Sequence, residues 1–521
     1  MSASDISPIP KGDIDDLSDL LESFWERKRG FYKLFSTDHG KYLYDPGSNK
    51  LLSCEIHEFE LLKLLLESDR VEAIKHFREH FGYDALAKAS ESIKNAIRNE
   101  SVLRITEFNN FGLFPSAEDI NYRITHDLGL LRLEVTDKCN LSCRYCVYDE
   151  NNKVAKKKHG SSFMTEQTAY AAIDYLYDHS AERKDIAIGF YGGEPLLNFR
   201  IIQNAVKYAI GRRGDKTINF TITTNATLIT AQIADFLRNY RFSVLVSIDG
   251  PSHYHDLWRV DTRNRGSYER SARGFRTLLD SYMGNESMIG INAVYAPPYS
   301  EGKLDELEDF FFKTSWMPSN PRVSVTYPAD GSMPLDSILR YGLYKGEDHS
   351  LINWARDKYY QNYPDCLDKN PLAKLIVDKS LAHIMKRPLL QKNFEKLHLN
   401  GCCLPGSRKV YVLSDGILTL CERVGDAPPI GDIENGANFD TLDKIYLDEY
   451  AQKSIRYCSH CWMARLCDIC YAHVFTDNSY DPQKKMKRCE PTRRLVEERL
   501  IFLSRLLERD YRGLDYLYEY E

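Results

Sequence analysis

The chain has 521 residues, which at roughly 150 residues per domain indicates about three domains. Its residues are 43% hydrophobic and 28% charged with a net charge of −6, so we expect packed cores. Nothing in the overall charge points to nucleic acid or to a membrane surface. No stretch approaches the ~20 apolar residues that cross a bilayer. The N-terminus lacks the basic and apolar regions of a signal peptide, so we expect a cytoplasmic protein.

Residues 1–110 are expected to form a separate small domain. The patterns predict a helix, a β-hairpin and two or three further helices in turn, over Ile14 to Arg29, Phe31 to Cys54 and Glu55 to Asn99. Asp45-Pro46-Gly47 supplies the turn chemistry of the hairpin. A hairpin with short helices is typical of a winged-helix-like arrangement, and an ordinary α+β cap is the alternative.

From Leu128 onward, strand-like runs alternate with helix-like runs. The expected strands are 128–135, 186–192, 218–225, 243–249, 289–296 and 322–329. Amphipathic stretches lie between them and begin near Thr165, Arg200, Thr230, Ser267 and Lys303. Six β/α units predict an α/β fold. Its parallel sheet should be curved as a partial (β/α)6 barrel over residues 125–330. The active site of such a sheet lies at the C-terminal ends of its strands.

The remainder of the chain is expected to divide into three parts. Residues 331–400 have a helical pattern and would form a bridging region. A cysteine-rich domain would follow over 401–490. A helix from Pro491 to Arg509 would make up most of the last part, 491–521. The run from Lys156 to His159 is expected to be a solvated loop. Thirteen cysteines in a chain that is neither small nor apparently secreted indicate metal binding rather than disulfides.

The first cysteine motif is Cys139-Asn-Leu-Ser-Cys143-Arg-Tyr-Cys146, directly after the first expected strand. Three thiolates can hold three irons of a cubane cluster and leave the fourth iron for a chelating ligand. A zinc site would require four ligands in tetrahedral geometry, which this loop does not supply. In this strand context, the CxxxCxxC pattern resembles the radical S-adenosylmethionine (AdoMet, SAM) superfamily. The resemblance implies a [4Fe–4S] cluster on these catalytic cysteines, with AdoMet on the open iron.

The resemblance also implies which residues contact AdoMet: Tyr145, Tyr148, Gly192, Gly193, Glu194, Asn225, Ser247 and Asp249. Glycines at the end of the second strand would let the backbone approach a ligand, and Glu194 would pair with the AdoMet amino group. Asn225 and Ser247 would bind the ribose or carboxylate, although both could instead be strand-end turn residues. Tyr148 would flank the adenine or simply pack. Arg259 resembles a recurrent family arginine without an assigned role.

A second group of cysteines lies between Cys402 and Cys489. The spacing C-x12-G-x4-C followed by C-x2-C-x5-C resembles the SPASM extension, which holds two auxiliary [4Fe–4S] clusters. The implied ligands are Cys403, Cys421 and Cys470 for the nearer cluster, and Cys458, Cys461, Cys467 and Cys489 for the outer one. The pair Cys467 and Cys470 departs from the family, which usually has three residues between these cysteines. Two structural zinc ribbons are the alternative.

Cys402 is the ambiguous neighbour of Cys403. Adjacent side chains of an extended backbone point to opposite faces, so the two should not ligate the same cluster. The nearer cluster would then keep an open iron. Cys54 and Cys366 stand apart from both motifs, and no role is predicted for them.

Taken together, the motifs are similar to those of radical SAM/SPASM maturases that install cysteine thioether bridges in sactipeptides and ranthipeptides. The resemblance implies that AdoMet cleavage gives a 5′-deoxyadenosyl radical, which takes hydrogen from a substrate Cα or Cβ. A substrate thiolate on the open iron then attacks that carbon, and the surplus electron leaves through the outer cluster. The overall reaction is a two-electron oxidation.

The same resemblance implies two partners. The N-terminal domain would bind the leader of a precursor peptide as an added strand, and a flavodoxin or ferredoxin would serve as electron donor. Two other classes remain open. One is a SPASM maturase that forms carbon–carbon crosslinks or oxidises a protein residue, as sulfatase-activating enzymes do. The other is a non-enzymatic winged-helix regulator with a sensing cluster, which would need no AdoMet pocket.

Overall fold

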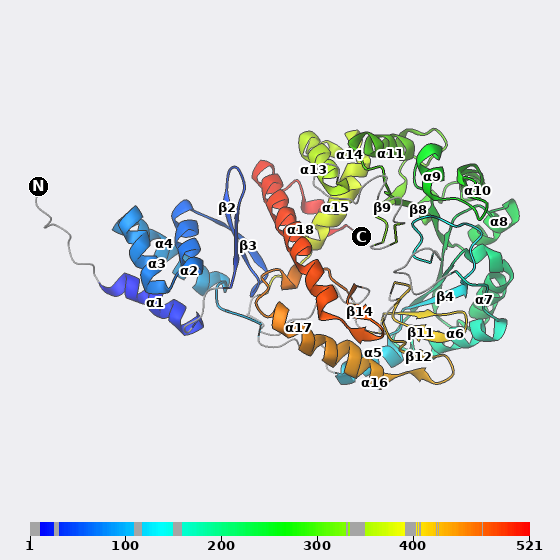
Figure 1. The fold of residues 1–521 in the computed structure, drawn as a ribbon, viewed down its shortest axis with the longest axis horizontal. Coiled ribbons are helices and arrows are strands. Elements are labelled where there is room, and N and C mark those ends of the chain that lie inside the picture. Colours follow the sequence, from blue (N-terminus) through cyan, green and yellow to red (C-terminus); the bar gives the residue numbers. More distant parts are fainter. Residues whose placement is uncertain are drawn as a thin grey trace, which may run out of the picture.

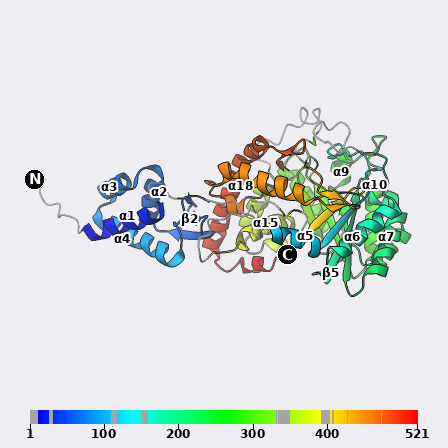
Figure 2. The same ribbon diagram turned by 90° about the horizontal axis from the view of Figure 1, so that it is seen from below.

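The structure is a computed structural model. It describes residues 11–25, 31–108, 117–148, 159–329, 332–333, 350–390, 403, 405, 408–423, 425, 427–470 and 473–520. Figure 1 shows an N-terminal unit (blue) beside a larger body, in which helices surround a curved sheet. Helix α18 (Pro482–Arg509) lies between the two in both views (Figures 1 and 2).

In its described residues, the N-terminal unit contains one small antiparallel sheet and four α-helices. Its elements are α1 (Lys11–Trp25), β1 (Lys33–Ser36), β2 (Lys41–Asp45), β3 (Lys50–Cys54), α2 (Ile56–Glu67), α3 (Arg70–Phe81), α4 (Tyr83–Asn95) and a π-helical turn, Ala96–Glu100. The strand order is β1-β2-β3, so the expected hairpin is one half of a three-stranded sheet. The buried Asp45 carboxylate fixes the β2–β3 turn, because it accepts the N–H of Ser48 at 2.7 Å and that of Leu103 at 3.0 Å.

The small sheet packs on both faces. Successive side chains of a strand point to opposite faces, and Leu43 accordingly joins the core of the N-terminal unit while Tyr44 joins that of the larger body. Tyr44 is fully buried, and its ring meets the Trp462 ring edge-on at 6.2 Å. The N-terminal unit is therefore docked on the cysteine-rich part of the chain. Its winged-helix classification stays a prediction.

The larger body is built on a parallel sheet. Its strands are β4 (Leu130–Thr136), β5 (Asp185–Gly192), β6 (Thr217–Thr224), β7 (Ser243–Ser247), β8 (Ile289–Val294) and β9 (Arg322–Thr326), all paired in parallel in this order. The α-helices along it are α5 (Ala117–His126), α6 (Glu166–Asp178), α7 (Phe199–Arg212), α8 (Ala231–Asn239), α9 (Ser252–Trp258), α10 (Tyr268–Ser281) and α11 (Glu301–Lys313). The prediction of an α/β fold with six parallel strands is confirmed.

The sheet continues into the cysteine-rich part of the chain. Strand β10 (Lys409–Val412) pairs in parallel with β4, and three short antiparallel strands extend the edge: β11 (Ile417–Thr419), β12 (Gly431–Asp432) and β13 (Gly436–Ala437). The sequence analysis placed a domain boundary at residue 401, but the sheet is continuous across it. The physical reason is that β4 would otherwise present a row of unpaired backbone groups.

The remaining elements lie around residues 350–390 and near the C-terminus. They are α13 (Leu351–Asn362), α14 (Cys366–Lys369), α15 (Pro371–Met385), α16 (Phe439–Thr441), α17 (Tyr450–Cys458), β14 (Phe475–Thr476), β15 (Ser479–Tyr480), the π-helical Leu442–Glu449 and the 3-10 turns Pro195–Asn198, Glu286–Met288, Ala464–Leu466 and Asp515–Tyr518. Helix α18 starts at Pro482 rather than at Pro491, because Asp481 caps the N–H groups of Gln483 and Lys484. No described helix is long and apolar enough to cross a membrane.

Candidate active site

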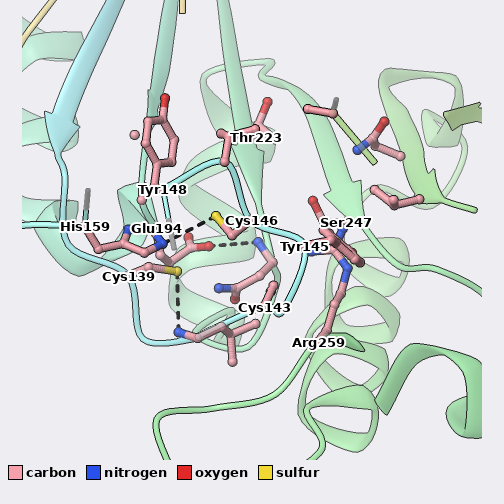
Figure 3. A pocket seen from close by; sticks show the side chains of 18 of the residues that line it. Cys139, Cys143, Tyr145, Cys146, Tyr148, His159, Glu194, Thr223, Ser247 and Arg259 are labelled. Carbon is pink, nitrogen blue, oxygen red and sulfur yellow. Dashed lines mark hydrogen bonds between the residues drawn. The ribbon is translucent and has the colours of Figure 1, made fainter. Parts of the chain in front are cut away.

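A pocket opens at the C-terminal ends of the parallel strands, where the sheet predicts an active site (Figure 3). Ten of the eleven residues predicted for cluster and AdoMet binding line it: Cys139, Cys143, Tyr145, Cys146, Tyr148, Gly192, Gly193, Glu194, Asn225 and Ser247. The eleventh, Asp249, is buried among protein partners and is absent from the pocket wall. The fold thus brings together residues from the ends of β5, β6 and β7 and from the loop after β4.

The cysteine loop is fastened to the end of β5 through backbone atoms. Gly193 donates its N–H to the Thr136 carbonyl and Glu194 donates to the Lys138 carbonyl, both at 2.9 Å. A Cβ on Gly193 would lie 2.2 Å from the Lys138 oxygen, and a Cβ on Gly192 would lie 2.0 Å from the Thr136 oxygen. The sequence analysis attributed these glycines to close approach of a ligand. The structure shows that they first permit close approach of the cysteine loop itself.

Glu194 is a buried carboxylate in the pocket wall. Its Oε1 accepts the Thr224 hydroxyl at 2.7 Å, and its Oε2 accepts the Asn225 N–H at 2.8 Å. Burial raises the pKa of Glu194 to about 7 against the opposing effect of these hydrogen bonds. No cationic side chain of the described residues pairs with it. A ligand ammonium group would therefore meet an acceptor already fixed in place.

Asn225 braces the cysteine loop. Its Nδ2 donates to the Asn140 side chain at 2.9 Å, and its Oδ1 accepts the Thr227 N–H at 3.0 Å and the Thr227 hydroxyl at 2.6 Å. The Asn140 side chain donates in turn to the Thr227 hydroxyl at 2.8 Å. Asn225 thus acts as a strand-end turn residue, and because it also lines the pocket its contact with AdoMet stays a prediction. Ser247 lines the pocket nearby and is 8% exposed.

A buried charged cluster supports the far side of the loop. Arg259 Nε lies 3.0 Å from Asp249 Oδ1, the Tyr145 hydroxyl donates to Asp249, and the Val294 N–H donates to Asp249 at 2.9 Å. Burial raises the pKa of Cys143 to about 12, while the positive charge of Arg259 acts against that rise. Arg259 thus receives a role that the sequence left unassigned: it neutralises Asp249 and places a cation beside Cys143.

His159 was missed by the sequence analysis, which placed it in a solvated loop. It lines the pocket, with Nε2 3.5 Å from Cys146 Sγ and Nδ1 3.0 Å from the Asp137 carbonyl (Figure 3). Its ring lies 5.6 Å from that of Tyr148. The neighbouring lysines 156–158 lie outside the described residues. The basic run concealed this histidine, because polar runs ordinarily indicate surface.

The C-terminal cysteines gather into two groups. Cys458, Cys461, Cys467 and Cys489 are close enough for their charges to interact: burial raises the pKa of Cys467 to about 12, and Cys458 and Cys461 act in the same direction. Cys470 likewise raises the pKa of Cys421, after burial as the main cause. Cys403 is exposed, and Cys402 lies outside the described residues. None of the described cysteines forms a disulfide.

Two cations accompany the group Cys458, Cys461, Cys467 and Cys489, called the outer cysteine group below. Lys485 is 1% exposed, donates to the Ser454 hydroxyl at 2.7 Å and lowers the pKa of Cys458, which burial raises. Arg493 lies beside Cys461, which raises the pKa of Arg493 against the effect of burial. A buried ammonium group requires a nearby anion. Thiolates on a metal cluster would supply that charge.

The residues of the pocket suit an iron–sulfur cluster and AdoMet. No group of three or more His, Cys, Asp or Glu side chains in the described ranges is arranged to hold a metal ion. A cubane differs from a single ion in that each cysteine binds a separate iron. Three half-buried thiols provide the donors that such a cluster requires. The Glu194 carboxylate, which no described cation neutralises, provides the anion for a cationic amino acid ligand.

The fold and the site define a class of proteins, namely parallel α/β barrels with a cysteine-lined pocket at the strand ends. Residues 133–311 match the family model described as the Radical SAM superfamily, so the chain carries a radical SAM domain. The chain is 27% identical over 187 residues to the radical SAM cyclopropyl synthase TigE of Paramaledivibacter caminithermalis. That match spans 34% of this chain and 38% of TigE.

Two further comparisons reach beyond the barrel. A cysteine-type anaerobic sulfatase-maturating enzyme of Clostridium novyi is 24% identical over 65% of this chain and 86% of its own length. The solved structure of native anSMEcpe with bound AdoMet has a TM-score of 0.52 and 20% identity, over 73% of this chain and 99% of that chain. The second comparison confirms the fold, and the radical SAM domain implies AdoMet and one [4Fe–4S] cluster as cofactors.

Proposed function

We propose that the chain is a radical SAM maturase that forms thioether crosslinks in a ribosomally made, cysteine-rich precursor peptide. The observation that carries the proposal is the pocket in which Cys139, Cys143 and Cys146 face the buried carboxylate of Glu194. When bound, the cluster and AdoMet supply a 5′-deoxyadenosyl radical that removes hydrogen from a substrate carbon. The protein supplies positioning and charge.

Each part of the pocket has a task in this proposal. The three cysteines bind three irons, and Glu194 accepts the amino group of AdoMet. The backbone N–H groups of Gly193 and Glu194 hold the cysteine loop through the Thr136 and Lys138 carbonyls. The Asn225 side chain holds it through Asn140. Holding reactants in a fixed geometry lowers the barrier, because the entropy of alignment is already lost on binding.

The C-terminal cysteines would hold two auxiliary [4Fe–4S] clusters, with Cys403, Cys421 and Cys470 on the nearer one and the outer cysteine group on the other. The pKa effects between Cys421 and Cys470, and among the outer cysteines, support this division of ligands. Zinc ribbons remain the rival. Metal analysis separates the two, since zinc bound at residues 403–489 would exclude auxiliary clusters.

The N-terminal unit would bind the leader of the precursor. Strand β1 faces α18, as the Lys33–Glu497 ion pair at 2.8 Å shows, whereas β3 pairs with β2 on one side only within the described residues. A peptide can add a strand at such an edge. Deletion of residues 1–110 should therefore weaken precursor binding while AdoMet cleavage without peptide persists; unchanged affinity for the precursor would exclude this role.

A second candidate is oxidation of a protein residue. The sulfatase-maturating relative of Clostridium novyi matches 65% of this chain, a longer match than the 34% of TigE. The products distinguish the two reactions. A precursor encoded beside the gene should lose two hydrogens per bridge, and the bridged cysteines should resist alkylation. Loss of two hydrogens with every cysteine still alkylated would instead indicate a carbon–carbon crosslink or residue oxidation.

A further inference from the structure

One face of helix α18 is basic, and it lies at the start of the helix. Lys484, Lys487, Arg488, Arg494 and Leu495 recur at helical spacing and so share this face. Lys487 and Arg494 are exposed, and Leu495 is 39% exposed although it is apolar. We call these five residues the α18 basic face. Lys487 and Arg494 carry its accessible positive charge, whereas Lys484 is half-buried and donates to the Phe475 carbonyl at 2.7 Å.

The charge of this segment opposes that of the whole chain. Between positions 484 and 494 there are six basic residues and one acidic residue, Glu490, whereas the chain has a net charge of −6. Glu490 follows Lys487 by three residues and precedes Arg494 by four, so it neighbours both on the helix, and it pairs with Arg493 at 3.2 Å. Lys487 and Arg494 form no ion pair with any described residue. The α18 basic face therefore keeps a net positive charge.

Its location next to the outer cysteine group gives this field a use. Cys489 is half-buried on the same helical turns. Lys485, one residue from the basic face, is buried and donates to the Ser454 hydroxyl at 2.7 Å on α17, the helix that ends at Cys458. One helix thus carries both a ligand of the outer group and the surface above it. Figures 1 and 2 show this helix between the N-terminal unit and the barrel.

We propose that the α18 basic face is the docking site of a small acidic electron-carrier protein of the flavodoxin or ferredoxin class. The inference rests on the proposed function, since it requires an iron–sulfur cluster on the outer cysteine group. One electron passes from the reduced cluster to the oxidised carrier, which is thereby reduced, and no atom is transferred. Complementary charge steers such an encounter and accelerates association. Contacts between electron-transfer partners are small, which suits a single helix face.

The test compares two charge-reversal variants of the full chain. Lys487→Glu/Arg494→Glu reverses two charges on the basic face, and Lys207→Glu/Arg213→Glu makes the same change in net charge at exposed positions of α7 and its end. Stopped-flow absorbance follows electron exchange with a purified flavodoxin and, separately, a ferredoxin. The first variant should exchange about tenfold more slowly or worse at low salt. The second should match the parent, and the parent's rate should fall as salt rises.

Four outcomes would overturn the proposal, and the measurements distinguish them. Equal rates in parent and first variant would overturn the docking site, as would no exchange with either carrier by a parent that holds both auxiliary clusters. Loss of precursor binding with unchanged carrier exchange in the first variant would assign the face to an acidic peptide and also overturn the proposal. Metal analysis of the parent is independent of the exchange rates. If it finds zinc in place of iron, the auxiliary clusters are excluded, and the docking proposal that depends on them is excluded too.

Discussion

The cysteine-lined pocket and the outer cysteine group differ in the charges that surround them. In the pocket, the cation of Arg259 is matched by Asp249 at 3.0 Å, and the carboxylate of Glu194 is left without a cation among the described residues. In the outer group, the buried Lys485 and the adjacent Arg493 lie against cysteines. The pocket is thus suited to receive a positively charged ligand. The outer cysteine group, with two cations beside it, is suited to stabilise a bound group that is always negatively charged.

The largest effect on stability is expected at Arg259, because Arg259 and Asp249 neutralise each other inside the protein. Arg259→Met leaves Asp249 buried without its cation and should lower the free energy of unfolding by about 3–5 kcal/mol. Arg270→Met is a matched control, because Arg270 pairs with Asp261 at 3.3 Å while 39% exposed, and such pairs contribute about 0–1 kcal/mol. Chemical denaturation of both variants measures the difference. Equal stability would contradict the role given to Arg259.

The next effect concerns the fastening of the cysteine loop. Gly193→Ala forces a Cβ to 2.2 Å from the Lys138 carbonyl and should cost about 1–3 kcal/mol of stability. Gly211→Ala in α7 has nothing within 4 Å of the new Cβ and should instead stabilise by about 0.5–1 kcal/mol. Denaturation curves and AdoMet binding check both. A Gly193 variant that binds AdoMet like the parent would show that the loop does not depend on this contact.

Glu194 links the pocket to pH. Burial raises its pKa from 4.5 to about 7, so below pH 7 the folded protein holds a proton there that the unfolded chain releases above about pH 4.5. The contribution of this group to stability therefore falls as pH rises through that window and is constant above it. Binding of the AdoMet ammonium has the opposite trend, because it requires the ionised carboxylate.

The expected result is that AdoMet affinity rises as pH increases from about 6 to 8 and then levels off. Glu194→Gln should bind about tenfold more weakly, which is about 1.4 kcal/mol, with little pH dependence. Isothermal titration calorimetry across this range measures both. A glutamine variant with unchanged affinity and pH profile would show that the carboxylate does not meet the amino group.

The smallest effect tests the other half of the comparison. Lys485→Met removes a buried cation beside Cys458. The reduction potential of the cluster proposed for the outer cysteine group should therefore fall by on the order of 60 mV, the one-electron equivalent of about 1.4 kcal/mol. Lys484→Met, on the outer face of the helix, should leave the potential close to that of the parent. Redox titration followed by electron paramagnetic resonance reads both. An unchanged potential in the Lys485 variant would remove the electrostatic contrast between the two regions.

Much of the barrel could be predicted because its signals are local. Strands β4 to β9 are short apolar runs, and the helices between them begin at caps such as Thr165 and Thr230, whose hydroxyls accept N–H groups of the first turn. The cysteine loop was identified from spacing. The pairing of β10 with β4 could not be predicted, because the sequence of a four-residue strand does not indicate which distant strand it pairs with.

Other residues escaped because their roles depend on tertiary contacts. Asp249 was expected at the ligand, but Arg259 and Tyr145 bind it from segments before and after it in the chain. His159 was hidden by a basic run. The start of α18 was misplaced because Pro491 reads as a helix start, although its missing N–H is tolerated inside this helix. Sequence spacing located the three cysteines that line the pocket but not the charged side chains beside them.

The central claim is that the pocket at the strand ends cleaves AdoMet. The direct measurement is 5′-deoxyadenosine formed from AdoMet by the reduced, anaerobically reconstituted chain and by its Cys139→Ala/Cys143→Ala/Cys146→Ala variant. We predict product from the parent with about twelve irons per chain, and none from the variant, which should keep about eight irons on its C-terminal cysteines. Equal product from the variant would contradict the account.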